Sequence, residues 1–153
     1  MSDPKLLELT ASGNFRARVE KTLDSLKSHG EDPKIFEGMR TPAQQREKVL
    51  RGVSKTMRSY HLKRGPDKLG LAADIADRKK GWNASKRFWL ILGANCQTRA
   101  LGWGGLFGLS AKHKKGLLVA MARLRDAGWP EDHDAYEVPI GWDPAHVQLD
   151  SNW

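Results

Sequence analysis

The sequence contains little that would cross-link a fold or anchor it in a membrane. Cys96 is the only cysteine, which excludes an intramolecular disulfide and every cysteine-rich zinc motif. No apolar run approaches the roughly 20 residues that span a bilayer, and the longest, 88–94, is typical of a core helix. The first residues lack the basic region and apolar stretch of a signal peptide, so we expect synthesis in the cytoplasm.

Acidic residues are also in the minority. The 153 residues include 26 Lys and Arg against 18 Asp and Glu, which gives a net charge of +8. This balance favours a polyanionic environment, and nucleic acid, anionic membrane and bacterial cell wall all qualify. A basic nucleic-acid-binding protein is therefore an alternative, although no recognition motif is present and the cations are scattered along the chain.

The remaining pattern is one of short amphipathic segments. Apolar residues spaced by three and four, with capping residues at the ends, predict helices over 15–28, 42–51, 84–94 and 110–127. Short apolar or β-branched stretches predict strands at 35–36, 71–75 and within 137–149, with a strand edge or tight turn at 102–105. Because no repeat, low-complexity tract or linker interrupts the chain, we expect a single α+β domain over residues 1–153.

Two polar clusters, far apart in the sequence, contain the residue types of a catalytic zinc site. The first is Ser-Tyr-His at 59–61 followed by Gly-Leu-Ala-Ala-Asp at 70–74, and the second is Trp-Asp-Pro-Ala-His at 142–146. Together they offer two imidazoles and a carboxylate as ligands, and a further carboxylate three residues before the last histidine. A catalytic zinc site needs three such ligands, an open position for water and a nearby base. If the clusters meet in space, the sequence predicts a metallohydrolase.

Two further blocks accompany these clusters. Glu-Gly-Met-Arg-Thr-Pro-Ala-Gln-Gln lies upstream at 37–45, and Leu-Gly-Trp-Gly-Gly lies between the clusters at 101–105. Each block alone is a weak signal, but four blocks in this order are specific. With these four blocks in this order, the chain resembles the zinc D-alanyl-D-alanine carboxypeptidases of the VanY type. It also resembles the related L-alanyl-D-glutamate endopeptidases found as bacteriophage endolysins.

The resemblance implies one catalytic zinc ion and a role for each matching residue. It makes His61, Asp74 and His146 the zinc ligands, and Asp143 matches the general base. The implied fold is a small antiparallel sheet flanked by helices, as in hedgehog-type domains and D-Ala-D-Ala peptidases.

Outside the zinc site, three more positions match the family pattern. Arg40 matches a position that binds a substrate carbonyl or carboxylate, and Gln45 and Ser59 match positions that line the site. Trp103 and Trp142 are expected to pack under the site and exclude water.

The function implied by the resemblance is a zinc-dependent peptidoglycan hydrolase of the endolysin kind. We expect it to cleave a stem peptide at the L-alanyl-D-glutamate bond, with a D-alanyl-D-alanine carboxypeptidase as the alternative and a non-hydrolytic zinc-binding relative as a third possibility. The expected partner is the peptidoglycan stem peptide, with no nucleic acid, no membrane insertion and a monomeric state. The expected organisation is one catalytic domain without a separate cell-wall-binding domain, acting on the wall after release from the cytoplasm.

The chain departs from the family pattern in three places. The stretch between His61 and Asp74 is about six residues longer than the compact form and contains Asp67, which is a rival ligand. The apolar residues before Asp74 favour it over Asp67, because they can hold a carboxylate rigidly. Met39 replaces an aromatic residue, and the segment 105–143 is longer than usual.

Overall fold

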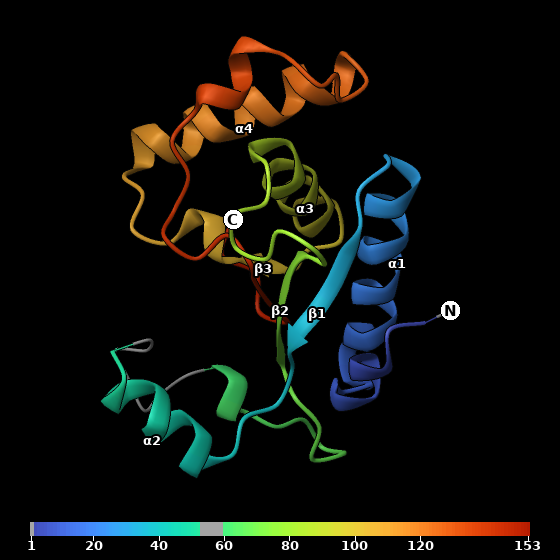
Figure 1. Cartoon of the computed structure of the whole chain (residues 1–153), viewed down its shortest axis with the longest axis vertical. Coiled ribbons are helices and arrows are strands. Elements are labelled where there is room, and N and C mark those ends of the chain that lie inside the picture. The colour runs from blue at the N-terminus through green and yellow to red at the C-terminus, as the bar shows by residue number, and fades with distance from the viewer. Residues whose placement is uncertain (1, 53–59) are drawn as a thin grey trace.

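The computed structural model describes residues 2–52 and 60–153 (Figure 1). Its α-helices are α1 (Phe15–Ser28), α2 (Pro42–Leu50), α3 (Lys86–Thr98) and α4 (Ala111–Asp126). Its strands are β1 (Pro33–Glu37), β2 (Ala72–Asp77), β3 (Gly102–Trp103) and β4 (His146–Gln148). The strands form one sheet in the order β1-β2-β4-β3, with every neighbouring pair antiparallel. The predicted α+β fold with a small antiparallel sheet and flanking helices is thus confirmed.

Local capping residues explain where the helices begin. The Thr41 hydroxyl accepts a hydrogen bond from the Gln44 backbone, and the Gln44 side chain accepts one from the Thr41 backbone, which completes a capping box at α2. Ser85 and Ser110 accept equivalent bonds at α3 and α4. The helix over 15–28 is confirmed at both ends.

The prediction for α3 was wrong by several residues at its C-terminal end. It stopped with the apolar run at residue 94, whereas α3 continues to Thr98. Residues 95–98 are mostly polar, yet Cys96 among them is fully buried in the core. The chain then turns at Ala100, whose φ of 55° lies in the left-handed region and ends the helix.

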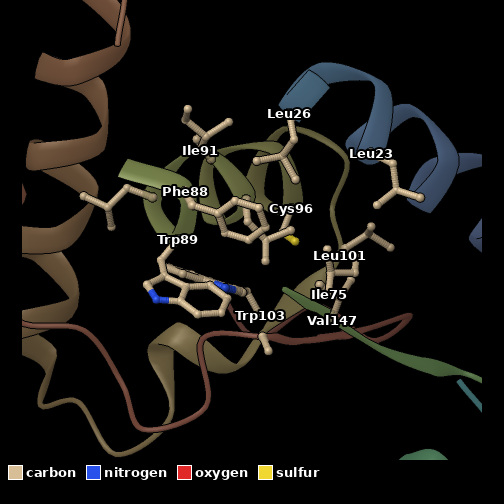
Figure 2. Close-up of a cluster of buried hydrophobic side chains, with 14 of the residues drawn as sticks. Leu23, Leu26, Ile75, Phe88, Trp89, Ile91, Cys96, Leu101, Trp103 and Val147 are labelled. Carbon is tan, nitrogen blue, oxygen red and sulfur yellow. The ribbon is translucent and has the colours of Figure 1, made fainter. Parts of the chain in front are cut away.

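One face of the sheet packs on the helices and the other carries the polar residues of the two clusters. Successive side chains of a strand point to opposite faces. Ile75 and Val147 therefore join Phe88, Trp89 and the other core residues between the sheet and α1 and α3 (Figure 2). Asp74 and His146, their neighbours in the same strands, project from the opposite face.

Trp103 connects the core to the second cluster. Its side chain is fully buried, and its indole nitrogen donates a 2.7 Å hydrogen bond to the Pro144 carbonyl. The segment that leads into His146 is thereby fixed to the core, as expected for a tryptophan beneath the site.

The long segment 105–143 adds a second layer of helix. Leu117, Met121 and Leu124 of α4 are buried, and α4 lies beside α3, away from α2 (Figure 1). A 3-10 turn at Asp134–Glu137, which sequence reasoning did not predict, packs against α4. No helix among the described residues combines the length and apolar character needed to cross a membrane.

Candidate metal centre

The structure brings His61, Asp74 and His146 together. Asp74 of β2 and His146 of β4 are direct partners in the antiparallel ladder, and His61 comes from a 3-10 turn at Tyr60–Leu62. All three side chains are buried, and one potential ligand atom from each lies within 4.8 Å of the others. Nε2 of His61 is 3.2 Å from Oδ1 of Asp74, and Nδ1 of His146 is 3.8 Å from the same oxygen.

Hydrogen bonds behind the imidazoles fix which nitrogen of each ring faces Asp74 with a lone pair. Nδ1 of His61 lies 2.7 Å from the Gly38 carbonyl, which can only accept, so Nδ1 bears the hydrogen. Nε2 of His146 lies 2.8 Å from Oε1 of Gln148, whose amide group donates to the Asp150 carbonyl and so turns its oxygen toward the ring. In the neutral state both inward nitrogens are acceptors, which is the form that binds a metal.

The carboxylate between these rings shows the same fit to a cation. Oδ1 of Asp74 is buried and accepts no hydrogen bond from the described residues. A buried carboxylate oxygen without a donor is costly, and here it faces two imidazole nitrogens. A divalent ion between them would satisfy all three groups, and two imidazoles with one carboxylate form a ligand set that suits zinc.

In the metal-free protein, a proton on an imidazole can supply part of the positive charge that a bound cation would bring. Burial opposes ionisation of Asp74, but His146 and His61 outweigh it and hold the pKa of Asp74 well below its usual range. Burial likewise opposes a charged His61, but the adjacent Asp74 raises the pKa of His61 above its ordinary value. The three groups thus stabilise positive charge at one point.

Arg40 lies on the other side of Asp74. Its Nη2 atom is 3.6 Å from Oδ2 of Asp74, and Nη1 donates a 2.7 Å hydrogen bond to Oε1 of Gln45. Gln45 is the one buried residue of α2, so this bond holds the buried side of the helix against Arg40. Ser59, the other predicted lining residue, lies outside the described residues.

Glu37 is a site residue that sequence reasoning missed. Its carboxylate accepts two hydrogen bonds from the Arg40 guanidinium, at 2.6 and 2.7 Å. Burial disfavours ionised Glu37, but Arg40 outweighs this and lowers the pKa of Glu37. A β-bulge between Ile35 and Glu37 sets Glu37 opposite Asp74. The signal was present, because Glu37 opens the block that also contains Arg40.

Asp143 lies close enough to the cluster to sense its charges. Burial and repulsion by Asp74 raise the pKa of Asp143 to about 6, against the attraction of the nearby imidazoles and Arg40. Its backbone is held at both ends, since its N–H donates to the Gly104 carbonyl and its carbonyl accepts from the His146 N–H. A β-carbon at Gly104 would collide with the Asp143 carbonyl, which explains the glycine there.

Asp67, the rival ligand, has a different role in the structure. Its carboxylate accepts hydrogen bonds from the Thr10 hydroxyl at 2.7 Å and from the Ala11 N–H at 3.0 Å. It also accepts from the Leu69 N–H within its own loop. These contacts lower the pKa of Asp67 and fasten the loop to the N-terminal segment.

Aromatic rings surround His146. The Phe107 ring centroid is 5.4 Å from that of His146, and Tyr60 lies at 6.2 Å. The Trp142 ring packs 5.2 Å from Phe107. The expectation that Trp142 packs under the site was wrong, because its side chain is 74% exposed.

Comparisons with known proteins find similarity in a segment of the sequence and in the fold. No protein-family model matches the chain. A segment of 49 residues, 32% of the chain, is 47% identical to the L-alanyl-D-glutamate peptidase of Listeria phage A118, and it spans 17% of that protein. The crystal structure of the Serratia marcescens L-Ala D-Glu endopeptidase ChiX superimposes with a TM-score of 0.54 at 20% identity, covering 95% of this chain and 83% of ChiX. The resemblance to this group of peptidases, first seen in the motifs, is thus confirmed in a segment of sequence and in the fold.

Proposed function

We propose that this chain is a zinc-dependent peptidoglycan hydrolase that cleaves the L-alanyl-D-glutamate bond of the stem peptide. The observation that carries the proposal is the pair of imidazoles whose hydrogen-bonded tautomers turn two lone pairs toward the unsatisfied Oδ1 of Asp74. The names of the phage peptidase and of ChiX supply the substrate class.

His61, Asp74 and His146 are proposed to hold the ion. When bound, zinc supplies Lewis acidity that polarises a peptide carbonyl and makes water more acidic. The chain must then contribute a base and an arrangement of charge around the scissile bond.

Asp143 is the proposed base. A carboxylate with a pKa near 6 is mostly ionised at neutral pH, yet it is basic enough to accept a proton from an attacking water molecule. The same carboxyl group can then donate that proton to the leaving amine. Its backbone bonds to Gly104 and His146 hold it beside the cluster.

Arg40 is proposed to act first through Asp74. With Glu37 and Gln45 fixing its guanidinium, its charge stands 3.6 Å from the Asp74 carboxylate and restricts the position of that ligand. Direct binding of a substrate carbonyl or carboxylate by Arg40 stays a prediction from the motif.

Zinc content, the products of peptidoglycan digestion and nucleic-acid binding separate this function from its alternatives. We expect purified protein to contain one zinc ion per chain and to release new N-terminal glutamate from peptidoglycan, identified by mass spectrometry, with activity lost on chelation and restored by zinc. Release of D-alanine would instead indicate the carboxypeptidase. Zinc binding without any cleavage would indicate a non-hydrolytic relative, and nucleic-acid binding without zinc would contradict the proposal altogether.

The wider setting follows from the same proposal. A protein with a net charge of +8 is attracted to an envelope rich in carboxylates and phosphates, and this attraction weakens as salt screens it. We propose that the protein acts as a monomer on the wall after release from the cytoplasm.

A further inference from the structure

Trp142 is exposed but held in a defined position. Its backbone N–H donates to the Phe107 carbonyl at 3.3 Å, and its ring packs against the Phe107 ring at an interplanar angle of 45°. On another side it meets Gly108, where an added β-carbon would lie 3.0 Å from Cδ1 of the indole. A large apolar side chain fixed in this way, with 74% of its surface exposed, presents a preformed flat face to solvent.

This flat face adjoins the candidate metal centre. The Phe107 ring lies between Trp142 and His146, with centroids 5.2 Å and 5.4 Å away. Trp142 also immediately precedes the proposed base Asp143 in the chain. A substrate at the centre therefore has a neighbouring group within reach of the indole.

We propose that Trp142, backed by Phe107, is a sugar-binding subsite that receives an N-acetylated sugar ring of the glycan strand. The inference rests on the proposed function and extends it from the peptide to the sugar that bears it. The first alanine of the stem peptide is joined to the sugar ring through a short lactyl ether, so one amino acid and this link separate the L-alanyl-D-glutamate bond from the ring. One residue spans at most about 3.6 Å and the lactyl link is of similar length, so the sugar must lie close to the metal centre.

The surfaces of a sugar ring and of the Trp142 indole are chemically complementary. The C–H groups on one face of a pyranose ring carry partial positive charge and match the negative face of an indole. The contact adds binding energy only when the substrate carries its sugar. Trp142 therefore selects glycan-linked stem peptides over free ones.

The matched control for Trp142 is Trp82. This residue is also exposed, at 51%, but its ring packs on Phe36 of β1 and contacts no ring of the metal cluster. Trp142→Phe retains a π face, whereas Trp142→Ala removes it.

The first test compares these variants on two substrates, a soluble disaccharide-linked stem peptide and the free peptide of the same sequence. We expect Trp142→Ala to lower kcat/KM about tenfold on the sugar-linked substrate and to leave the free peptide unchanged. Trp142→Phe should keep most of the preference for the sugar, and Trp82→Ala should keep all of it. An equal loss on both substrates, or the same loss in Trp82→Ala, would overturn the subsite.

The second test measures binding without catalysis. The metal-free protein is titrated with the β-1,4-linked tetramer of N-acetylglucosamine while the indole N–H signals are followed by NMR. We expect the Trp142 signal to shift and the affinity to fall about tenfold in Trp142→Ala. An unmoved Trp142 signal, or an unchanged affinity in Trp142→Ala, contradicts the proposal. This titration still decides the subsite if the wild-type protein cleaves neither substrate, a result that would refute only the proposed function.

Discussion

Glu37 and Arg40 form a two-pronged ion pair beside the candidate metal centre. Nε of Arg40 lies 2.6 Å from Oε1 of Glu37, and Nη2 lies 2.7 Å from Oε2. The same guanidinium approaches Asp74 to 3.6 Å. A planar guanidinium held at two points cannot rotate freely. Glu37 therefore fixes the orientation in which the positive charge of Arg40 faces Asp74.

This relationship predicts that Glu37→Gln weakens both fold and site. The amide removes the charge that balances Arg40 in a partly buried position, and we expect a loss of about 2 kcal/mol in the free energy of unfolding. We also expect hydrolysis to fall at least tenfold as Arg40 loses its fixed orientation. Urea unfolding and peptidoglycan hydrolysis measure the two effects.

Glu47→Gln is the matched control for that change. Glu47 of α2 pairs at 3.3 Å with Arg51, the residue that follows the helix, but both side chains are about two-thirds exposed. Such surface pairs contribute about 0–1 kcal/mol, so Glu47→Gln should leave stability and activity nearly unchanged. Equal effects of the two substitutions would refute a special role for Glu37.

The proposed roles predict two classes of variant, one that loses the metal and one that keeps the metal but loses turnover. His61→Ala, Asp74→Ala and His146→Ala should each abolish stoichiometric zinc and hydrolysis, because each removes one of the three proposed ligands. Asp143→Ala should retain zinc but lose turnover by at least a hundredfold, the usual scale for a lost general base. Metal analysis beside a hydrolysis assay checks both, and a fully active Asp143→Ala protein would exclude Asp143 as the base.

Asp67→Asn tests the rival ligand. Asp67 binds Thr10 and Ala11 rather than the cluster, so the substitution should leave the zinc content at its wild-type value. It should lower the urea midpoint at neutral pH, because an amide accepts hydrogen bonds from Thr10 and Ala11 less strongly than a carboxylate. Loss of zinc in Asp67→Asn would show that the ligand set is misassigned.

The raised pKa of Asp143 predicts a pH-dependent cost in the metal-free protein. Its folded pKa of about 6 exceeds the ordinary 3.8, so the folded state binds the proton more tightly than the unfolded state. Ionised Asp143 therefore lowers the free energy of unfolding. This loss is absent below the ordinary pKa of 3.8 and fully present once the pH is above the folded pKa of about 6. Asp143→Asn should raise the free energy of unfolding by about 1 kcal/mol at pH 8, after allowance for partial exposure. At pH 4 the two urea curves should nearly coincide, and a gain as large as that at pH 8 would contradict this origin.

Features that depend on neighbours in the sequence were predictable. The helix over 15–28 follows from its apolar spacing, and the start of α2 follows from Thr41 and Pro42, whose conformations are locally determined. The strand that delivers Asp74 was recognised from its apolar residues, although it extends to Asp77. The motifs likewise identified the residues that the structure gathers around Asp74.

Features that depend on distant contacts were not predictable. The bulge that presents Glu37 arises from pairing between β1 and β2, and no residue type in 35–37 signals it. The position of Trp142 is fixed by contacts with Phe107 and Gly108, which lie more than thirty positions earlier in the chain. The attachment of Asp67 to Thr10 crosses an even larger gap of 57 residues in the sequence.

The pairing of Asp74 with His146 has a consequence for biosynthesis. β4 is the last strand of the sheet in chain order, and it inserts between β2 and β3, which both precede it. Pairing β4 with β2 closes the long segment between Asp77 and His146, and such a closure is slow relative to the formation of local helices. A growing chain therefore cannot assemble the proposed ligand set until residue 146 has emerged and β4 has paired with β2.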